Sequence, residues 1–144
     1  MMDRATWMSV LARAGADAIE ALLDGAPALP PHRRLRGPET GLTMLRGRAG
    51  GDGAGFNLGE ATVTRCSVTL DCGRIGHAWR LGRDARAAEL SALLDAALQD
   101  PARAPALLAA VIKPLAEAQQ EAAAQQSRRA AATGVRFATL SSMR

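Results

Sequence analysis

Aromatic side chains are scarce in this 144-residue chain, which has no tyrosine. The aromatic residues are Trp7, Phe56, Trp79 and Phe137. We therefore expect a modest core of aliphatic residues and alanine, in a chain long enough to fold as one domain. Nucleic-acid-binding modules usually present aromatic side chains for stacking beside their basic surface. The scarcity of aromatics argues against a nucleic-acid partner, and a small basic nucleic-acid-binding protein is kept only as an alternative interpretation.

Cysteines and long apolar runs are scarce as well. Cys66 and Cys72 are too few and wrongly spaced for a disulfide framework or for a zinc or iron–sulfur site. No stretch approaches the ~20 apolar residues of a membrane-spanning helix, and the N-terminus lacks the apolar run of a signal peptide. We expect a soluble cytoplasmic protein with reduced thiols and no membrane partner.

Lysine is nearly absent, so the positive charge of the chain comes from arginine. Lys113 is the single lysine, the net charge is +4, and the sequence pI is near 10.4. The planar guanidinium group of arginine suits phosphate, phosphonate and carboxylate groups. A bias towards arginine beside abundant alanine can equally reflect codon usage, so the charge alone does not select a ligand.

The hydrophobic patterns predict a single α+β domain, in which an antiparallel β-meander of three to four strands is flanked by N-terminal and C-terminal helices. Val and Thr are dense in Ala61–Leu70, and short glycine-containing turns join the strand segments. The expected strands are Gly41–Arg48, Ala61–Leu70 and Ile75–Leu81, in a sheet over 38–82. This sheet follows a connection at 26–37, within which Arg33–Arg36 could form a short extended piece. The expected helices are Arg4–Arg13 and a helix capped by Asp17, both within a helical segment 1–25, then 84–99, and a kinked helix or helix pair over 105–133, before a tail at 135–144.

The end of the chain is strongly helical by composition but has little to bury. Between Ala116 and Ala132 alanine is the only apolar residue type, and Pro114 kinks or divides the helix before it. This helix is either exposed or packed closely against another molecule. Val135-Arg136-Phe137 then forms an apolar-tipped tail that could dock on the protein or on a partner.

The glycine-rich run Gly50–Gly55 has two interpretations. Glycines let backbone amides approach a phosphate, but a phosphate loop also needs a following lysine and a helix. Here Phe56 leads into a strand instead. A hairpin turn is therefore the favoured interpretation.

Arg83 and Asp84 lie where the last strand should pass into a helix, which makes them candidates for an anion site. A helix N-terminus offers free amides and positive potential, and Arg83 could add a bidentate contact to a phosphate oxygen. The alternative is that Asp84 caps the helix and that Arg83 forms a surface pair.

Arg65 and Glu39 form a second candidate group, because each lies in otherwise apolar strand sequence. We expect a structural ion pair between them, and a shared recognition surface that includes Arg65 as an anion ligand is the alternative. His32 and His77 have no carboxylate or cysteine at metal-ligand spacing, and no nucleophile elbow or paired-carboxylate motif occurs. No catalytic residue and no metal ligand are predicted.

Several short motifs together resemble the PhnG family, the G subunit of the bacterial carbon–phosphorus lyase core complex. They are Trp7-Met8-Ser9-Val10-Leu11, Pro38-Glu39-Thr40-Gly41-Leu42, Arg48-Ala49-Gly50-Gly51-Asp52-Gly53, Phe56–Arg65 and Gly82-Arg83-Asp84. Their order and spacing match from about residue 4 to Gln99, and Lys113-Pro114-Leu115 resembles the later helix of the family. The segment 26–36 and the Ala/Gln-rich C-terminal helix depart from the family pattern.

The resemblance implies a cytoplasmic subunit that acts in phosphonate metabolism with protein subunits H, I and J and with the L protein. The family's complex uses MgATP as a substrate and displaces adenine with a phosphonate, which gives a ribose 1-phosphonate 5-triphosphate. Base displacement is attributed mainly to the I subunit. We therefore expect a non-catalytic or accessory subunit that binds no cofactor by itself and is inactive alone, within a multi-subunit transferase. The alternative is direct participation in phosphonate or triphosphate binding at a shared active site.

Overall fold

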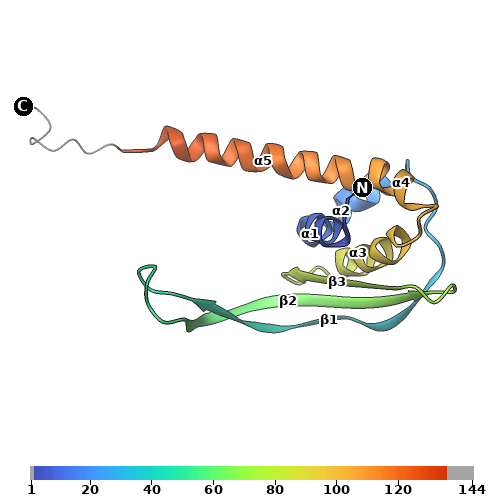
Figure 1. The fold of residues 1–144 in the computed structure, drawn as a ribbon, viewed down its shortest axis with the longest axis horizontal. Helices are drawn as coiled ribbons and strands as arrows, with labels where there is room; N and C mark the ends of the chain where they lie inside the picture. The colour runs from blue at the N-terminus through green and yellow to red at the C-terminus, as the bar shows by residue number, and fades with distance from the viewer. Residues whose placement is uncertain (1, 136–144) are drawn as a thin grey trace, which may run out of the picture.

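The computed structural model describes residues 2–135, which form a helical head on one side of an antiparallel sheet (Figure 1). The elements are α1 (Arg4–Arg13), α2 (Ala16–Leu23), β1 (His32–Gly47), β2 (Phe56–Leu70), β3 (Ile75–Leu81), α3 (Ala85–Leu98), α4 (Ala104–Leu107), the π-helical turn η1 (Leu108–Ile112) and α5 (Lys113–Ala132). This architecture confirms the predicted α+β class, with strands in the order β1-β2-β3.

The sheet is a meander whose last strand is much shorter than the first two. β3 pairs with β2 only from Val63 to Thr69. Beyond Val63 the β1–β2 hairpin continues as a two-stranded ribbon, residues 42–62, which we name the arm. Figure 1 shows the arm and α5 extending from the same side of the helical head.

β1 begins earlier than the sequence predicts. The expected start near residue 38–41 was wrong, because the strand starts at His32, includes the extended piece considered at Arg33–Arg36, and passes through Gly37-Pro38. Register shifts between Arg34 and Arg36 and between Arg36 and Glu39 allow this, since a bulge takes up residues that do not fit the ladder. β2 likewise starts at Phe56, and Ala61 lies inside it.

The N-termini of α3 and α2 are capped in different ways. Asp84 caps α3 as predicted, because its Oδ1 accepts a hydrogen bond from Ala87 N–H at 2.9 Å. The predicted Asp17 cap was wrong: α2 starts at Ala16 with Gly15 as its N-cap. Asp84 Oδ2 lies 3.4 Å from Ala16 N, so a carboxylate from another element reaches this helix start.

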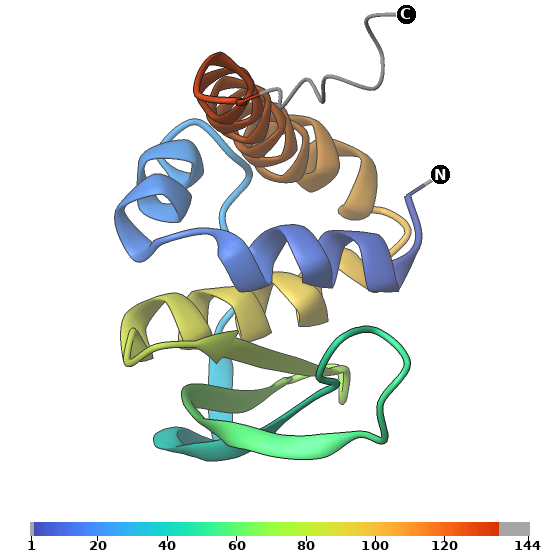
Figure 2. The ribbon, with the colours of Figure 1, turned by 90° about the vertical axis from the view of Figure 1, so that its left-hand side faces the viewer.

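α3 is the centre of the fold. Figure 2 shows it between the sheet and α1, and nearly every residue from Ala87 to Leu98 is buried. Its sheet-facing alanines pack on Cys66, Val68 and Ala78. Its other side contributes Leu90, Leu94 and Leu98 to the helical core. Small residues on the sheet side let the strands approach the helix backbone closely.

The C-terminal helix changes its hydrogen-bond pattern just before Pro114. Lys113 N–H donates to Leu108 O, which gives the π-helical turn η1, and the proline then lies in the first turn of α5, where its missing donor is tolerated. Leu115 is the buried residue of α5, and Gln119 Nε2 still donates to Val10 O of α1 at 2.9 Å; the later part of the helix projects away from the head. In the described part of the chain, no helix combines the length and the apolar content that crossing a membrane requires. The predicted tail lies outside the described residues except for Val135.

Candidate functional site

The turn Gly82-Arg83-Asp84 joins β3 to α3, and its carboxylate is already engaged. Asp84 accepts from Ala87 N–H, lies within 3.4 Å of Ala16 N, and lies 3.8 Å from Arg80 Nη2. An incoming anion would have to compete with this carboxylate for the α3 N-terminus. Arg83 is exposed, and no hydrogen bond or ion pair within residues 2–135 involves its side chain. The structure thus places Arg83 in solvent beside a capped helix.

Arg65 and Glu39 lie opposite each other on β2 and β1, and Trp79 follows on β3. Arg65 Nε donates to Glu39 Oε1 at 2.5 Å, and the guanidinium carbon lies 5.3 Å from the centre of the Trp79 ring. This cluster lies on the sheet face opposite α3. An exposed ion pair contributes little to stability, so its main effect is to keep the guanidinium group beside the half-exposed indole, at a cation–π distance. The structure brings Arg65 to Glu39 and not to Arg83.

The glycine-rich run forms the hairpin turn at the tip of the arm. Gly50 and Gly51 have positive φ angles of 66° and 82°, which glycine adopts without a steric penalty. The chain then enters β2 at Phe56, and no helix follows the turn. The hairpin interpretation is confirmed.

The two histidines lie on opposite sides of the sheet. His77 Nδ1 lies 2.9 Å from Ser67 Oγ on the open face, whereas His32 Nε2 lies 3.1 Å from Glu89 Oε1 on α3. Within residues 2–135, no group of three or more His, Cys, Asp or Glu side chains is arranged to hold a metal ion.

Asp95 is the most densely bonded side chain, and sequence reasoning missed it. It is fully buried on α3. Arg4 donates to it through Nε at 3.0 Å and Nη2 at 2.7 Å, Trp7 Nε1 donates at 3.0 Å, and the backbone N–H of His77 donates at 2.9 Å. This carboxylate therefore ties α1, α3 and β3 together. Its sequence signal was an acidic residue within the apolar run Leu93-Leu94-Asp95-Ala96-Ala97.

Glu89 holds the early part of β1 against α3. Arg34 donates to it through Nε at 2.8 Å and through Nη2 at 2.6 Å, and His32 lies beside it. These contacts, the Arg34 hydrogen bonds foremost, lower the pKa of Glu89 from its ordinary 4.5 to about 2, against the opposing effect of burial. They also explain why β1 begins at His32.

The lowered pKa of Glu89 predicts a loss of stability in acid. A carboxylate with a lower pKa in the folded state stabilises the fold above its unfolded pKa, and this contribution disappears as the pH falls from about 4.5 to about 2. We expect Glu89→Gln to lower the free energy of unfolding by roughly 1–2 kcal/mol at pH 6, since Arg34 is more than half exposed and the pair is screened. Urea unfolding of both proteins between pH 6 and pH 2 measures this difference. It should shrink to near zero at pH 2, and a difference that does not change with pH would contradict the assignment.

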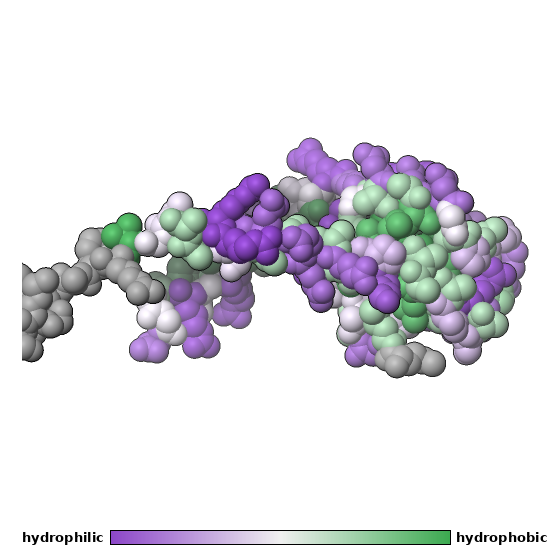
Figure 3. Space-filling model, turned by 90° about the horizontal axis from the view of Figure 1, so that it is seen from above, coloured by the Kyte–Doolittle hydropathy of each residue, from purple (hydrophilic) through white to green (hydrophobic). Residues whose placement is uncertain are grey.

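The arm exposes a set of large apolar side chains that the helical head does not cover. They are Leu42, Met44, Leu45, Phe56 and Leu58, with exposed fractions of 44–64%. In contrast, Figure 3 shows hydrophilic side chains over much of the projecting α5. Large exposed apolar side chains gathered on one element of a small protein are typical of a site of protein–protein interaction. The exposed apolar side chains of the arm are the main candidate interaction surface on this small α+β fold.

Comparison with known proteins agrees with the sequence motifs. Residues 2–142 match the family described as phosphonate metabolism protein PhnG. The chain therefore belongs to the PhnG family. A relative from Rhizobium meliloti (strain 1021), named alpha-D-ribose 1-methylphosphonate 5-triphosphate synthase subunit PhnG, is 45% identical over 100 residues. That match covers 69% of this chain and 64% of the relative, so the chain spans less than two thirds of the length of the relative.

Proposed function

We propose that this chain is an accessory subunit of an enzyme complex that makes ribose 1-phosphonate 5-triphosphate from MgATP and a phosphonate, with release of adenine. The observation that carries the proposal is its membership of the PhnG family, together with 45% identity to a protein named as a subunit of such a synthase. The partners are the H, I and J subunits and the L protein of the carbon–phosphorus lyase system. MgATP is a substrate of the complex, and this chain supplies binding surface and no catalytic group.

The arm is the part of the chain best suited to hold a partner. A two-stranded ribbon alone is marginally stable in water, and this one has apolar side chains exposed along both strands. Burying several of them against another subunit would add roughly 1–2 kcal/mol each. The arm continues from the three-stranded part of the sheet that α3 covers, so its base is held to the head.

Co-expression with the I subunit tests the proposal. We expect the two chains to co-purify, the melting temperature of this chain to rise in the complex, and the isolated chain to show no release of adenine from MgATP. A ligand that binds only the folded state raises the melting temperature by mass action. Failure to co-purify together with an unchanged melting temperature would contradict an accessory role.

Direct contact with a phosphonate or triphosphate at a shared active site is a second candidate role. The observation that favours it is the exposed Arg83 beside the α3 N-terminus. In this case Arg83→Ala should lower the turnover of the assembled complex at least tenfold without weakening assembly. Arg129→Ala on the exposed face of α5 is the matched control. Unchanged turnover in the Arg83 variant would eliminate this role.

A further inference from the structure

The outer edge of β3 differs from the outer edge of β1. Isolated sheet edges are usually protected by charges, proline or bulges. β1 has all three, because Arg33, Arg36 and Pro38 lie in it and its ladder carries register shifts. β3 is a regular strand from Ile75 to Leu81 with one charged residue, Arg80.

The direction of the backbone groups on β3 follows from the bonds at its two ends. Leu70 N–H donates to Arg74 O, and Gly82 N–H donates to Thr62 O. Because bonding alternates along an antiparallel pair, the even-numbered residues between them bond to β2 and the odd-numbered residues point outward. Two contacts agree with this: His77 N–H donates outward to Asp95, and Ile75 O accepts from Gln99.

The outward backbone N–H groups of Trp79 and Leu81 have no such partner in α3. The ladder with β2 uses the even-numbered residues of β3, so it does not engage the backbone N–H of Trp79 or Leu81. Within residues 2–135, no other hydrogen bond engages these two N–H groups. Their side chains are 55% and 69% exposed. The last half of the edge therefore presents free backbone donors and acceptors at the spacing of a strand.

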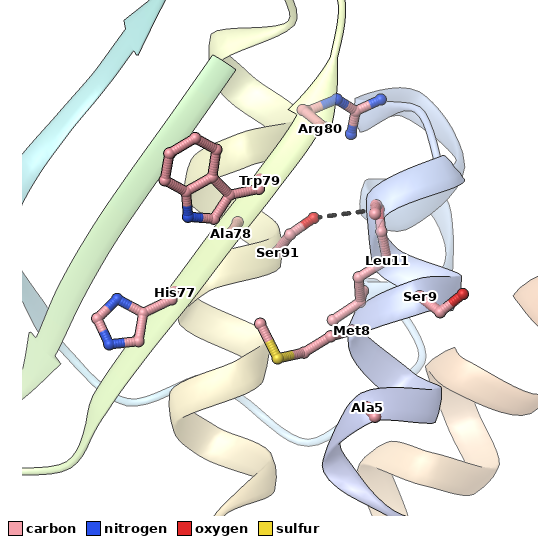
Figure 4. Close-up of a pocket in the computed structure, with 10 residues that line it drawn as sticks. Ala5, Met8, Ser9, Leu11, His77, Ala78, Trp79, Arg80 and Ser91 are labelled. Carbon is pink, nitrogen blue, oxygen red and sulfur yellow. Dashed lines mark hydrogen bonds between the residues drawn. The ribbon is translucent and has the colours of Figure 1, made fainter. Parts of the chain in front are cut away.

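A groove runs along this edge between β3 and α1, as Figure 4 shows. Ala5, Met8 and Ala12 form its α1 wall, and Ser91 of α3 lies at its floor. Half of the lining consists of alanine and serine, which leaves room beside the strand.

One buried donor in the groove has no acceptor. Arg80 lines the groove, and its side chain is 9% exposed. Its Nη1 donates to Ala14 O at 2.6 Å, but its Nε has no hydrogen-bond partner. A buried donor without an acceptor is costly, and an oxygen atom entering the groove would remove that cost.

We propose that this groove binds an extended segment of a partner subunit, which adds to β3 as a fourth strand beside Trp79 and Leu81. Main-chain hydrogen bonds supply the affinity, as in other strand additions, and a carbonyl oxygen of the segment accepts from Arg80 Nε. The α1 wall of Ala5, Met8 and Ala12 offers the inward side of the segment an apolar surface to pack on. The inference rests on the proposed accessory role and adds the mode of binding.

Hydrogen exchange of the full chain, alone and in complex with the proposed partner subunits, tests this mode of binding. The amides of Trp79 and Leu81 should exchange fast in the free chain and at least tenfold more slowly in the complex. Unchanged exchange at both amides in a complex that does form would overturn strand addition and leave the accessory role intact. No complex at all would overturn both. Slow exchange that depends on the concentration of the free chain would identify a second copy as the occupant, and would also overturn the proposal.

Two variants of Trp79 distinguish the contribution of its backbone N–H to partner binding from the contribution of its side chain. Trp79→Pro removes the outward N–H without touching the ladder with β2, and Trp79→Val removes the indole but keeps the N–H. We expect the proline variant to bind the partner at least tenfold more weakly than the valine variant, with both folded by circular dichroism. Equal affinities would overturn the proposal. Should the proline variant not fold, the exchange measurement on the unaltered chain decides.

Discussion

Asp95→Ala should cost this protein a large part of its stability. The substitution leaves the buried indole N–H of Trp7 and the backbone N–H of His77 without an acceptor and removes the anchor of Arg4. Removing one partner from a buried charged network costs about 3–5 kcal/mol, and we expect the lower part of this range because Arg4 can reach water. In a chain of this length, that corresponds to a fall in melting temperature of about 10 °C.

Thermal unfolding followed by circular dichroism measures the effect of the Asp95 variant. Asp52→Ala is the matched control, since Asp52 is an exposed aspartate in the hairpin turn and should change the melting temperature by less than about 2 °C. Similar melting temperatures for the two variants would show that Asp95 does not tie the three elements together.

Gly76→Ala should be more damaging still. A Cβ atom at this position would overlap Ala92 O and would lie 2.5 Å from Ala96 N, both in the backbone of α3. A helix backbone cannot move aside as a flexible side chain can, so the strand must leave the helix. We expect a loss of more than ~4 kcal/mol, which is enough to leave much of the chain unfolded.

Gly41→Ala provides the comparison within the same sheet. A Cβ atom there meets nothing within 4 Å, and the backbone has no positive φ angle. Urea unfolding of this variant should differ from that of the original chain by less than about 1 kcal/mol. A Gly76 variant that is as stable as the Gly41 variant would contradict the close packing of β3 on α3.

The parts of the fold that were predicted correctly have strong local signals. Val and Thr density placed β2, the turn Asp71-Cys72-Gly73-Arg74 placed β3 after it, and Asp84 marked the start of α3. The start of β1 was missed because Gly37-Pro38 is typical of a break in a strand. In the folded chain, bulges absorb that dipeptide, and Glu89, more than fifty positions away, holds the segment in place. A contact of that range has no local signature.

The residues of the candidate sites likewise differ in whether a local sequence signal or a long-range contact places them. The cross-strand position of Glu39 and Arg65 follows from the meander register, so their proximity could be expected from sequence. The Asp95 cluster could not, because its donors come from α1 and from the edge of β3, and their meeting depends on how the helices stack. The groove beside β3 was also invisible, since it depends on where α1 packs. An exposed arm is foreseeable only once β3 is known to be shorter than its neighbours.

The arm variant Leu42→Asp with Leu58→Asp tests most directly whether this chain assembles through its arm. Both leucines are 64% exposed, so the isolated variant should keep the melting temperature of the original chain. Two carboxylates in a buried apolar interface would each be strongly unfavourable, and we expect affinity for the I subunit to fall at least a hundredfold. Gln125→Asp with Gln126→Asp on exposed α5 adds the same charge elsewhere and should bind normally. Binding by the arm variant that equals binding by this control would contradict assembly through the arm.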